Sequence, residues 1–345
     1  MNPKQARDRL DGLWRRGLAC LGTRYAIMGG AMTWVSERHL VAALSNGGGF
    51  GVIANGAMAP DQLADEIDGT MALTEMPFGV NLVTMHPDLE ALGDVCIAKG
   101  ISHVVLAGGL PRSATISRLK DGGAKVVCFA PALAIARKLV RLGVDAIVIE
   151  GMEAGGHIGP VSTGVLAQEI LPVIREVPVF VAGGIGRGEA ILAYLEMGAS
   201  GVQLGTRFVC ATESIAHPRF KQAFIRASAR DAVASVQVDP KFPVIPVRAL
   251  RNDASARFVE AQHEVIARFR GGELDQKQAQ LEIEYFWVGA LRRAVFEGDV
   301  ENGSLMAGQS VGMVAEEQPA AEIIEELVDQ AAAVLLARES IEAAE

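Results

Sequence analysis

One histidine stands in a glycine-dense turn directly after an apolar stretch of the sequence. The β-branched run 147–149 is typical of a buried strand, and His157 lies in the turn 151–159 that follows it. Four of the nine positions in this turn are glycine, which costs backbone entropy unless a sharp turn or a close ligand requires it. An imidazole can give or take a proton near neutral pH, so the turn is predicted to carry acid–base chemistry. Taken alone, His157 could equally be a hydrogen-bonded structural histidine.

Two further glycine-rich loops predict a phosphate site. Gly183-Gly184 and Gly205-Thr206 each follow an apolar run and precede a helical segment. Backbone N–H groups at helix N-termini favour phosphate, and the Thr206 hydroxyl adds a donor. Ordinary tight turns are the alternative interpretation. No glycine cluster completes the G-x-G-x-x-G fingerprint, which favours a mononucleotide over a dinucleotide as cofactor.

The elements that must position these loops alternate regularly. Short apolar strands alternate with helices, which indicates parallel pairing through crossovers and predicts an α/β fold, a closed (β/α)8 TIM barrel. A doubly wound open sheet is the alternative. Ser36 is predicted to cap the helix that begins at Glu37, and the first helix is placed at 5–16. The predicted strands are 25–28, 50–54, 78–82, 103–106, 125–129, 145–149, 179–182 and 201–204.

The alternation stops after the eighth predicted strand. Helices are predicted at 252–269 and 277–296, so this region is interpreted as a helical insertion at the barrel mouth. The terminal amphipathic helix, 317–337, is expected to supply the eighth barrel helix. The predicted domains are a barrel made of 20–212 and 303–345, and a substrate-side insertion of 213–302.

Composition excludes some classes of function. A net charge of −9 and a pI near 5.3 argue against nucleic-acid binding through a general basic field. Four widely separated cysteines predict neither a zinc site nor disulfides, and no metal is expected. Cys96, Cys128 and Cys210 are expected to be buried thiols in a reducing compartment. The absence of a long apolar run and the polar N-terminal segment predict a cytoplasmic protein without a membrane partner.

Several motifs together resemble the nitronate monooxygenase and enoyl-acyl carrier protein reductase II family, also described as 2-nitropropane dioxygenase-like. The similarity runs from about Tyr25 to the terminal helix. Each motif alone is weak, but the set is specific. The motifs are Glu150-Gly-Met-Glu-Ala-Gly-Gly-His157-Ile-Gly159, Ala182-Gly-Gly-Ile185, Gln203-x-Gly-Thr-Arg-Phe208, Pro77-Phe-Gly-Val-Asn81 and Gly303-Ser-x-Met-Ala-Gly-Gln309.

The resemblance implies a flavin mononucleotide (FMN) enzyme on a TIM barrel. It assigns catalysis to His157 and the FMN phosphate to the loops at Gly183-Gly184 and Gly205-Thr206. Relatives of the reductase type carry Gln-Gly-Gly-Met where this chain has Gly29-Gly30-Ala31-Met32, so contacts made by that glutamine are not carried over. The implied cofactor-binding residues are Gly30, Ala31, Met32, Asn81, Glu150, Gly155, Gly156, Ala182, Gly183, Gly184, Gln203, Gly205, Thr206, Met306 and Ala307.

The expected reaction is that of the reductase branch. NADH or NADPH would reduce the flavin, and the flavin would pass hydride to an enoyl thioester, carried as a small molecule or on an acyl carrier. A nitronate monooxygenase that uses O2 is the alternative, followed by an NAD(P)H:quinone reductase and a non-catalytic flavin-binding protein. A homodimer is among the expected assemblies.

Some residues of the insertion and the loops keep two interpretations. Arg248 and Arg251 could meet a phosphate or acidic carrier, or be solvated helix residues. Trp34 and Trp287 could cover the flavin or pack in the core. His217, before Pro218, is interpreted as a helix-start or surface residue.

Overall fold

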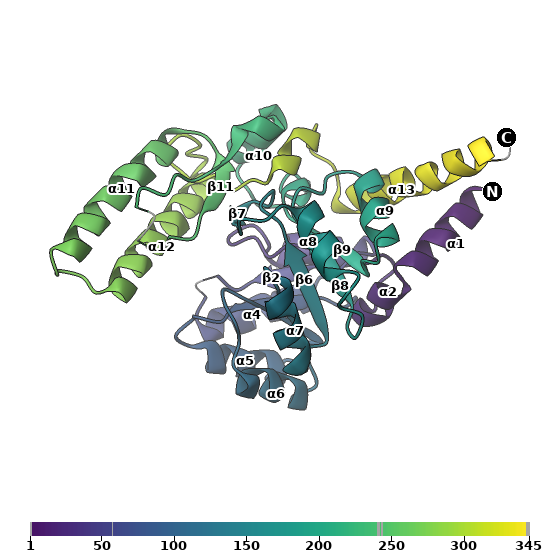
Figure 1. Cartoon of the computed structure of the whole chain (residues 1–345), viewed down its shortest axis with the longest axis horizontal. Coiled ribbons are helices and arrows are strands. Elements are labelled where there is room, and N and C mark those ends of the chain that lie inside the picture. The colour runs from purple at the N-terminus through teal and green to yellow at the C-terminus, as the bar shows by residue number, and fades with distance from the viewer. Residues whose placement is uncertain (1, 57, 240–241, 243, 343–345) are drawn as a thin grey trace.

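Eight parallel strands form a nearly closed barrel in the computed structural model, which describes residues 2–56, 58–239, 242 and 244–342 (Figure 1). The strand order is β1-β9-β8-β6-β5-β4-β3-β2, and a parallel bridge from Met28 to Phe50 joins the two ends of this sheet. The TIM-barrel prediction is confirmed. The strands are β1 (Ile27–Gly29), β2 (Val52–Ala54), β3 (Gly79–Val83), β4 (His103–Ala107), β5 (Lys125–Phe129), β6 (Ala146–Glu150), β8 (Val179–Ala182) and β9 (Gly201–Leu204).

Helices surround the barrel in the expected alternation, and they cover strands that are buried almost throughout. Ile147, Val148 and Ile149 are fully buried, and each such side chain stabilises the fold by roughly 1.5–3 kcal/mol relative to an exposed one. The helices after successive strands are α3 (Arg38–Asn46), α4 (Pro60–Met71), α5 (Leu89–Ala98), α6 (Ser113–Asp121), α7 (Leu133–Arg141), α8 (Thr163–Ile170) and α9 (Gly188–Glu196).

The last helix, α13 (Ala320–Glu342), supplies the eighth barrel helix. It packs against α9 and α3, and also against the N-terminal helix α1 (Pro3–Leu13), so segments from both ends of the chain lie side by side (Figure 1). A second short helix, α2 (Arg15–Leu21), follows α1. The single helix predicted at 5–16 is therefore wrong, because the backbone at Trp14 leaves the helical region and separates α1 from α2.

The predicted cap of α3 is also wrong. Glu37 is the N-cap, and its carboxylate accepts hydrogen bonds from the backbone N–H groups of His39 and Leu40. The Ser36 hydroxyl instead donates to the Gly30 carbonyl at 2.8 Å and accepts from Met32 N at 3.0 Å. Ser36 thus holds the loop after β1, and the longer carboxylate one position later satisfies the helix end.

The region after the barrel contains strands as well as helices. It comprises α10 (Pro218–Arg226), β10 (Ala232–Ala234), β11 (Val247–Leu250), α11 (Asp253–Arg270), α12 (Gln276–Arg292) and a π-helical turn, Arg293–Glu297. The helices of the predicted insertion are present, and two short strands that the sequence analysis did not predict lie beside them. β10 and β11 pair antiparallel, and β11 also pairs with β7 (Gly156–His157). Strands this short have no detectable period, so only the tertiary pairing reveals them.

The helices α11 and α12 form a hairpin that extends away from the barrel at the left of Figure 1. They enclose a hydrophobic cluster separate from the barrel core, which includes Phe258 and Trp287 with ring centroids 4.2 Å apart. The division into a barrel domain and a 213–302 domain stays a prediction. None of the helices in the described ranges has the length and apolar character needed to cross a bilayer.

Candidate active site

His157 lies on β7. This short strand is part of the loop that follows β6, and it also belongs to the small sheet formed with β10 and β11. Its backbone is in register with Val247, and the next residue, Ile158, donates its N–H to Pro246 O at 2.9 Å. Its side chain is exposed. The loop after β6 therefore presents the imidazole to solvent, while pairing with β11 fixes the backbone that carries it.

Glu150, the last residue of β6, is an acid with a strongly shifted ionisation. Burial raises the pKa of Glu150 to about 7, and the nearby charge of His157 opposes this rise. The carboxylate is disfavoured because it loses hydration at the end of a buried strand. Near neutral pH this carboxyl exists in both protonation states, so Glu150 and His157 form a pair of groups able to hold or move a proton.

The His157 loop is clamped against the 303–309 segment. Gln309 donates its N–H to Glu153 O at 2.9 Å, and Gly308 donates to Thr206 Oγ1 at 2.9 Å. A Cβ added to Gly155 would stand 2.6 Å from Gly308 N, closer than real Cβ atoms approach, so only glycine fits there. The loops after β6 and β9 are thus both bound to the same downstream segment.

The Glu153 carboxylate secures the other side of this loop. Its Oε2 accepts from the backbone N and the hydroxyl of Thr163, both at 2.9 Å, at the start of α8. The Thr163 hydroxyl also lies 3.0 Å from Gly183 O. The loop after β6 is therefore fixed to the turn after β8 by a chain of short polar contacts.

The predicted phosphate turns have the backbone geometry that such a site requires. Gly183 and Gly184 have φ values of +96° and +73°, in the left-handed region that favours glycine. Ala182 pairs with Gln203, so this turn and the one at Gly205-Thr206 follow adjacent strands. Across the described ranges, the N–H groups of Gly183, Gly184, Gly205 and Thr206 have no backbone or side-chain acceptor. They can serve as donors to an anion.

The other predicted cofactor residues also lie at or near the carboxyl ends of the strands. Gly30, after β1, donates to Leu204 O at 2.8 Å, and Ala31 and Met32 follow in the same loop. The Met32 sulfur would be 3.4 Å from a Cβ on Gly205, so this loop packs on the phosphate turn. Met306, followed by Ala307, bridges to Ala249 of β11, and its sulfur faces Gly156.

Asn81 and Gln203 are buried polar residues on the strands themselves. Asn81 Nδ2 donates to Val105 O at 3.0 Å, which ties this amide to the neighbouring strand. Gln203 is 7% exposed, and its backbone is in register with both Met28 and Ala182. The structure therefore places Gln203 on a strand between β1 and β8, beside the predicted phosphate turns, with Asn81 farther round the barrel.

Asn55 is a polar residue of this region that sequence reasoning missed. It follows β2, is 1% exposed, and its Oδ1 has no hydrogen-bond partner among the described residues. Nδ2 makes a 3.3 Å contact with Met58 O, and the backbone N–H donates to Asn81 O. A buried acceptor without a donor costs about 1–3 kcal/mol, which a bound group carrying an N–H would relieve. A lone asparagine after an apolar run was the only signal in the sequence.

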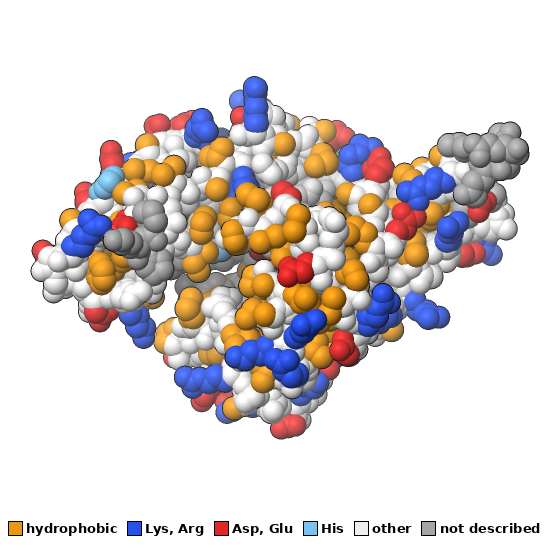
Figure 2. All heavy atoms as spheres, viewed as in Figure 1, with side chains coloured by type: hydrophobic (Ala, Val, Ile, Leu, Met, Phe, Trp, Pro, Cys, Tyr) orange, Lys and Arg blue, Asp and Glu red, His pale blue; other side chains and the backbone are white. Residues whose placement is uncertain are grey.

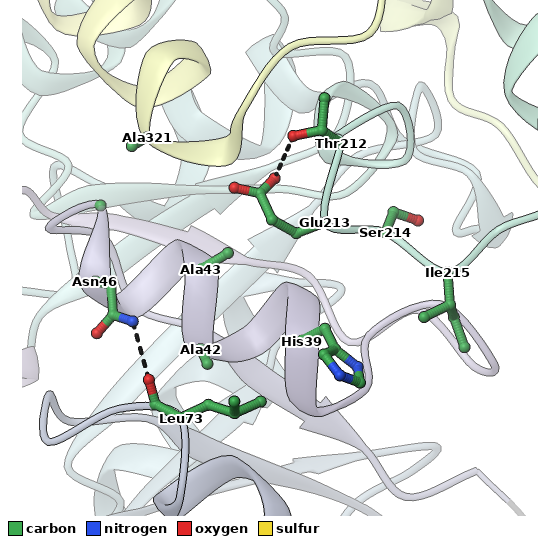
Figure 3. Close-up of a pocket in the computed structure, with 11 residues that line it drawn as sticks. His39, Ala42, Ala43, Asn46, Leu73, Thr212, Glu213, Ser214, Ile215 and Ala321 are labelled. Atoms are coloured by element: carbon green, nitrogen blue, oxygen red, sulfur yellow. Dashed lines mark hydrogen bonds between the residues drawn. The ribbon is translucent and has the colours of Figure 1, made fainter.

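Two cavities stand out, and only one lies at the strand ends that carry the predicted chemistry. A cavity of about 660 Å³ runs along α3, between His39, Asn46, Leu73 and the 212–215 segment (Figure 3). Its polar groups serve the fold, because Asn46 donates to Leu73 O and Glu213 accepts from Ala320 N at the start of α13. We assign this larger cavity no chemistry.

The second cavity, of about 240 Å³, opens among the loops after β4, β5 and β6 and includes Glu150 in its wall. Figure 2 shows a hollow in the face of the molecule between the side carrying α4 to α7 and the elements near α10 and β11, with hydrophobic side chains on both sides. The carboxyl ends of the strands are the usual site of chemistry in this fold.

Three other residues singled out in the sequence, Arg248, His217 and Trp34, make contacts within the fold. Arg248 is 5% exposed, and its guanidinium donates to Met152 O at 2.9 Å and to Ala232 O at 2.6 Å, whereas Arg251 is exposed. Burial lowers the pKa of Arg248. His217 caps α10 as predicted, with Nδ1 accepting from Arg219 N, and Trp34 packs edge-on to Phe296.

The cysteines and the buried His103 take no part in the site. All four cysteines are free and buried, and burial raises the pKa of the Cys96, Cys128 and Cys210 thiols to about 12. Burial lowers the pKa of His103 to about 4, and its Nε2 lies 2.8 Å from Cys20 O. No cluster of three or more His, Cys, Asp or Glu side chains suited to a metal occurs in the part of the chain that is described.

Comparisons with known proteins identify the family of this chain. The family model described as nitronate monooxygenase matches residues 16–95 and 93–330. The (3aS,4S,5R,7aS)-5-hydroxy-7a-methyl-1-oxo-octahydro-1H-indene-4-carboxyl-CoA dehydrogenase of Mycobacterium tuberculosis is 30% identical over 337 residues, covering 89% of this chain and 93% of that protein.

Solved structures of the same kind align over almost the whole chain. FabK from Thermotoga maritima, an enoyl-acyl carrier protein reductase II, is 36% identical with a TM-score of 0.84, covering 94% of this chain and 98% of that one. A nitroalkane oxidase from Streptomyces ansochromogenes is 26% identical with a TM-score of 0.75, covering 91% and 98%. The chain belongs to the nitronate monooxygenase family and is an FMN-dependent oxidoreductase.

Proposed function

We propose that this enzyme is an NAD(P)H-dependent reductase that adds hydrogen across the carbon–carbon double bond of an enoyl thioester. The observation that carries the proposal is the likeness to FabK, in sequence and in fold, over 94% of the chain. The Mycobacterium tuberculosis relative is named for a carboxyl-CoA substrate, so two of the three relatives are named for thioester chemistry.

The residues at the barrel mouth fit FMN. Gly183, Gly184, Gly205 and Thr206 would hold the phosphate, since their backbone donors follow two adjacent strands. The unpaired Oδ1 of Asn55 suits a ligand with an N–H donor, which the flavin ring has. When bound, FMN supplies the hydride relay between NAD(P)H and the β-carbon of the acceptor.

His157 and Glu150 would manage the proton that accompanies this hydride. Hydride addition at the β-carbon leaves negative charge on the α-carbon and the thioester oxygen. The exposed imidazole of His157 can donate a hydrogen bond to that oxygen or a proton to the α-carbon. The donated proton leaves with the product, and Glu150, with a pKa of about 7, can pass a new proton taken from solvent to His157 between turnovers.

An anaerobic reduction experiment tests the proposal. NADH or NADPH is added to the FMN-loaded enzyme, and flavin absorbance is followed before and after addition of an enoyl-CoA. We expect bleaching by a reduced nicotinamide and recovery of the colour by the thioester. His157→Ala should keep the bound flavin but slow recovery by about 10²–10⁴-fold, the range typical of a lost general acid. Bleaching by neither nicotinamide would contradict the proposal.

Nitronate oxidation is the second candidate. The matched family model and the nitroalkane oxidase structure favour it. In that reaction a nitronate would reduce the flavin directly and oxygen would reoxidise it. Anaerobic bleaching by an alkyl nitronate, with no response to NADH or NADPH, would establish this activity instead.

A further inference from the structure

We infer that the cavity at the carboxyl ends of β4, β5 and β6 binds the hydrocarbon part of the acyl group, while the reacting carbons lie beside His157. This inference rests on the proposed thioester substrate and extends it to the class of acyl group. The wall of the cavity includes Leu110, Phe129, Ala130, Pro131, Ile135 and Glu150.

The chemistry of the wall selects an apolar ligand. Five of these six side chains are hydrocarbon, and no Lys, Arg or His is present in the described lining. A nucleotide phosphate or the acidic surface of a carrier protein would find no cation there to offset its desolvation. A hydrocarbon group, in contrast, gains roughly 25 cal/mol for each Å² of apolar surface it buries.

The position of the cavity relative to the site supports the same conclusion. In the order of strands around the barrel, β5 lies four positions from β1 and three positions from β9. In a barrel of eight strands, β5 is therefore directly across the mouth from the loop after β1. Glu150 and Gly159, which flank the His157 loop, both contribute to the wall. A ligand that reacts beside His157 can therefore extend into this cavity without crossing the phosphate turns after β8 and β9.

The volume sets the size of the group. A dry cavity of about 150 Å³ accepts one benzene molecule. By that measure a cavity of about 240 Å³ accepts roughly ten non-hydrogen atoms, the size of a medium-length chain or a small ring system. The enzyme is thus suited to thioesters with bulky acyl groups over those with two to four carbons.

Gly159 offers a direct way to reduce the cavity. A Cβ added there would meet no atom within 4 Å, and its φ lies outside the left-handed region, so a side chain can begin there without a clash or backbone strain. Ile135, on α7, offers the opposite change, because Ile135→Ala enlarges the cavity. Gly12 on α1 also has open space around its Cβ position, so Gly12→Leu is a matched control far from the mouth.

The test compares acceptors of different chain length with the FMN-loaded enzyme. For trans-2-enoyl-CoA thioesters of about four and ten carbons, Gly159→Leu should lower the ratio of kcat/KM for the long over the short acceptor by at least about tenfold. Ile135→Ala should shift the preference toward bulkier acceptors, and Gly12→Leu should change neither ratio. Unchanged ratios in both cavity variants would overturn the inference.

The same variants separate this inference from its alternatives. If Gly159→Leu weakens FMN binding tenfold or more, measured by fluorescence titration, the cavity holds the flavin and the inference is wrong. If no thioester is reduced by any form, the proposed function fails, and the chain-length comparison is repeated with alkyl nitronates of two and eight carbons. A length preference there that Gly159→Leu abolishes would retain the hydrocarbon subsite, and its absence would overturn it.

Discussion

Among the residues near the candidate site, Glu150 is the one whose pKa the fold shifts most clearly. Its pKa is raised to about 7 in the folded protein, whereas in the unfolded chain it ionises near 4.5. The stability that protonated Glu150 contributes is therefore fully present below pH 4.5, and it is lost as the pH rises through 7. Above pH 7 the folded protein must hold a poorly hydrated carboxylate.

Glu150→Gln should therefore stabilise the protein only at the upper end of this range. We expect little difference in the free energy of unfolding at pH 4.5, and a gain of roughly 1–2 kcal/mol at pH 8, after discounting the shift for the partial exposure of the side chain. Urea unfolding of both proteins at both pH values measures this difference in the free energy of unfolding. A gain of equal size at pH 4.5 would show that packing, not ionisation, is responsible.

Single residues also show how far the sequence could predict the site. His157 and the glycine turns are predicted from glycine density and residue type, which can be read directly from the sequence, and their roles stay predictions. The sequence does not predict that Glu37, and not Ser36, caps α3. The reason is the hydrogen bond of Ser36 to the loop after β1, which only the structure reveals. Asn55 was missed because an unpaired amide is recognised only when its surroundings are known.

Among the elements, β7 and β11 determine how the loop that carries His157 is held. Arg248 of β11 donates to Met152 O in the loop after β6 and to Ala232 O at β10, so one buried guanidinium joins three segments. The eight barrel strands were predictable from repeated apolar runs, whereas β7, β10 and β11 were not. β7 pairs with residues of β11 about 90 positions away, and β10 and β11 are too short to show a period in the sequence.

Arg248→Met should loosen this junction. It leaves two carbonyl groups without their donor, at a cost of about 1–3 kcal/mol each, and it should lower both the melting temperature and kcat. Arg248→Lys should restore part of the melting temperature and part of kcat, because an ammonium can satisfy one carbonyl but not the two held by the guanidinium. Thermal melts and turnover rates measure these effects.

The exposed neighbour Arg251 provides the control. Arg251→Met should change stability by no more than about 0.5 kcal/mol. If Arg248→Met behaves like Arg251→Met, the junction does not hold the loop.

At the scale of the whole molecule, two hydrophobic clusters of unequal size share the chain. The large one fills the barrel and its helices, and the small one lies between α11 and α12 around Phe258 and Trp287. Local opening costs less where fewer apolar contacts are lost. The inserted region is therefore expected to open before the barrel does.

Hydrogen exchange can follow this difference directly. Backbone amides of α11 and α12 should exchange faster than those of β3 to β6, by about tenfold or more, under conditions in which the protein is native. Mass spectrometry of peptides after timed exchange would give the two rates. Equal protection would show that the chain unfolds as one unit and would argue against the predicted 213–302 domain.

The placement of α13 affects how the protein is made. Strands β1 and β9 are complete by residue 204, but the helix that covers the space between α9 and α3 begins only at Ala320. A ribosome needs on the order of 5–20 s to add the roughly 100 residues between them. During that time the apolar faces of α3 and α9 that α13 covers in the complete chain have no cover, so we expect the partly synthesised chain to aggregate more readily than the complete one.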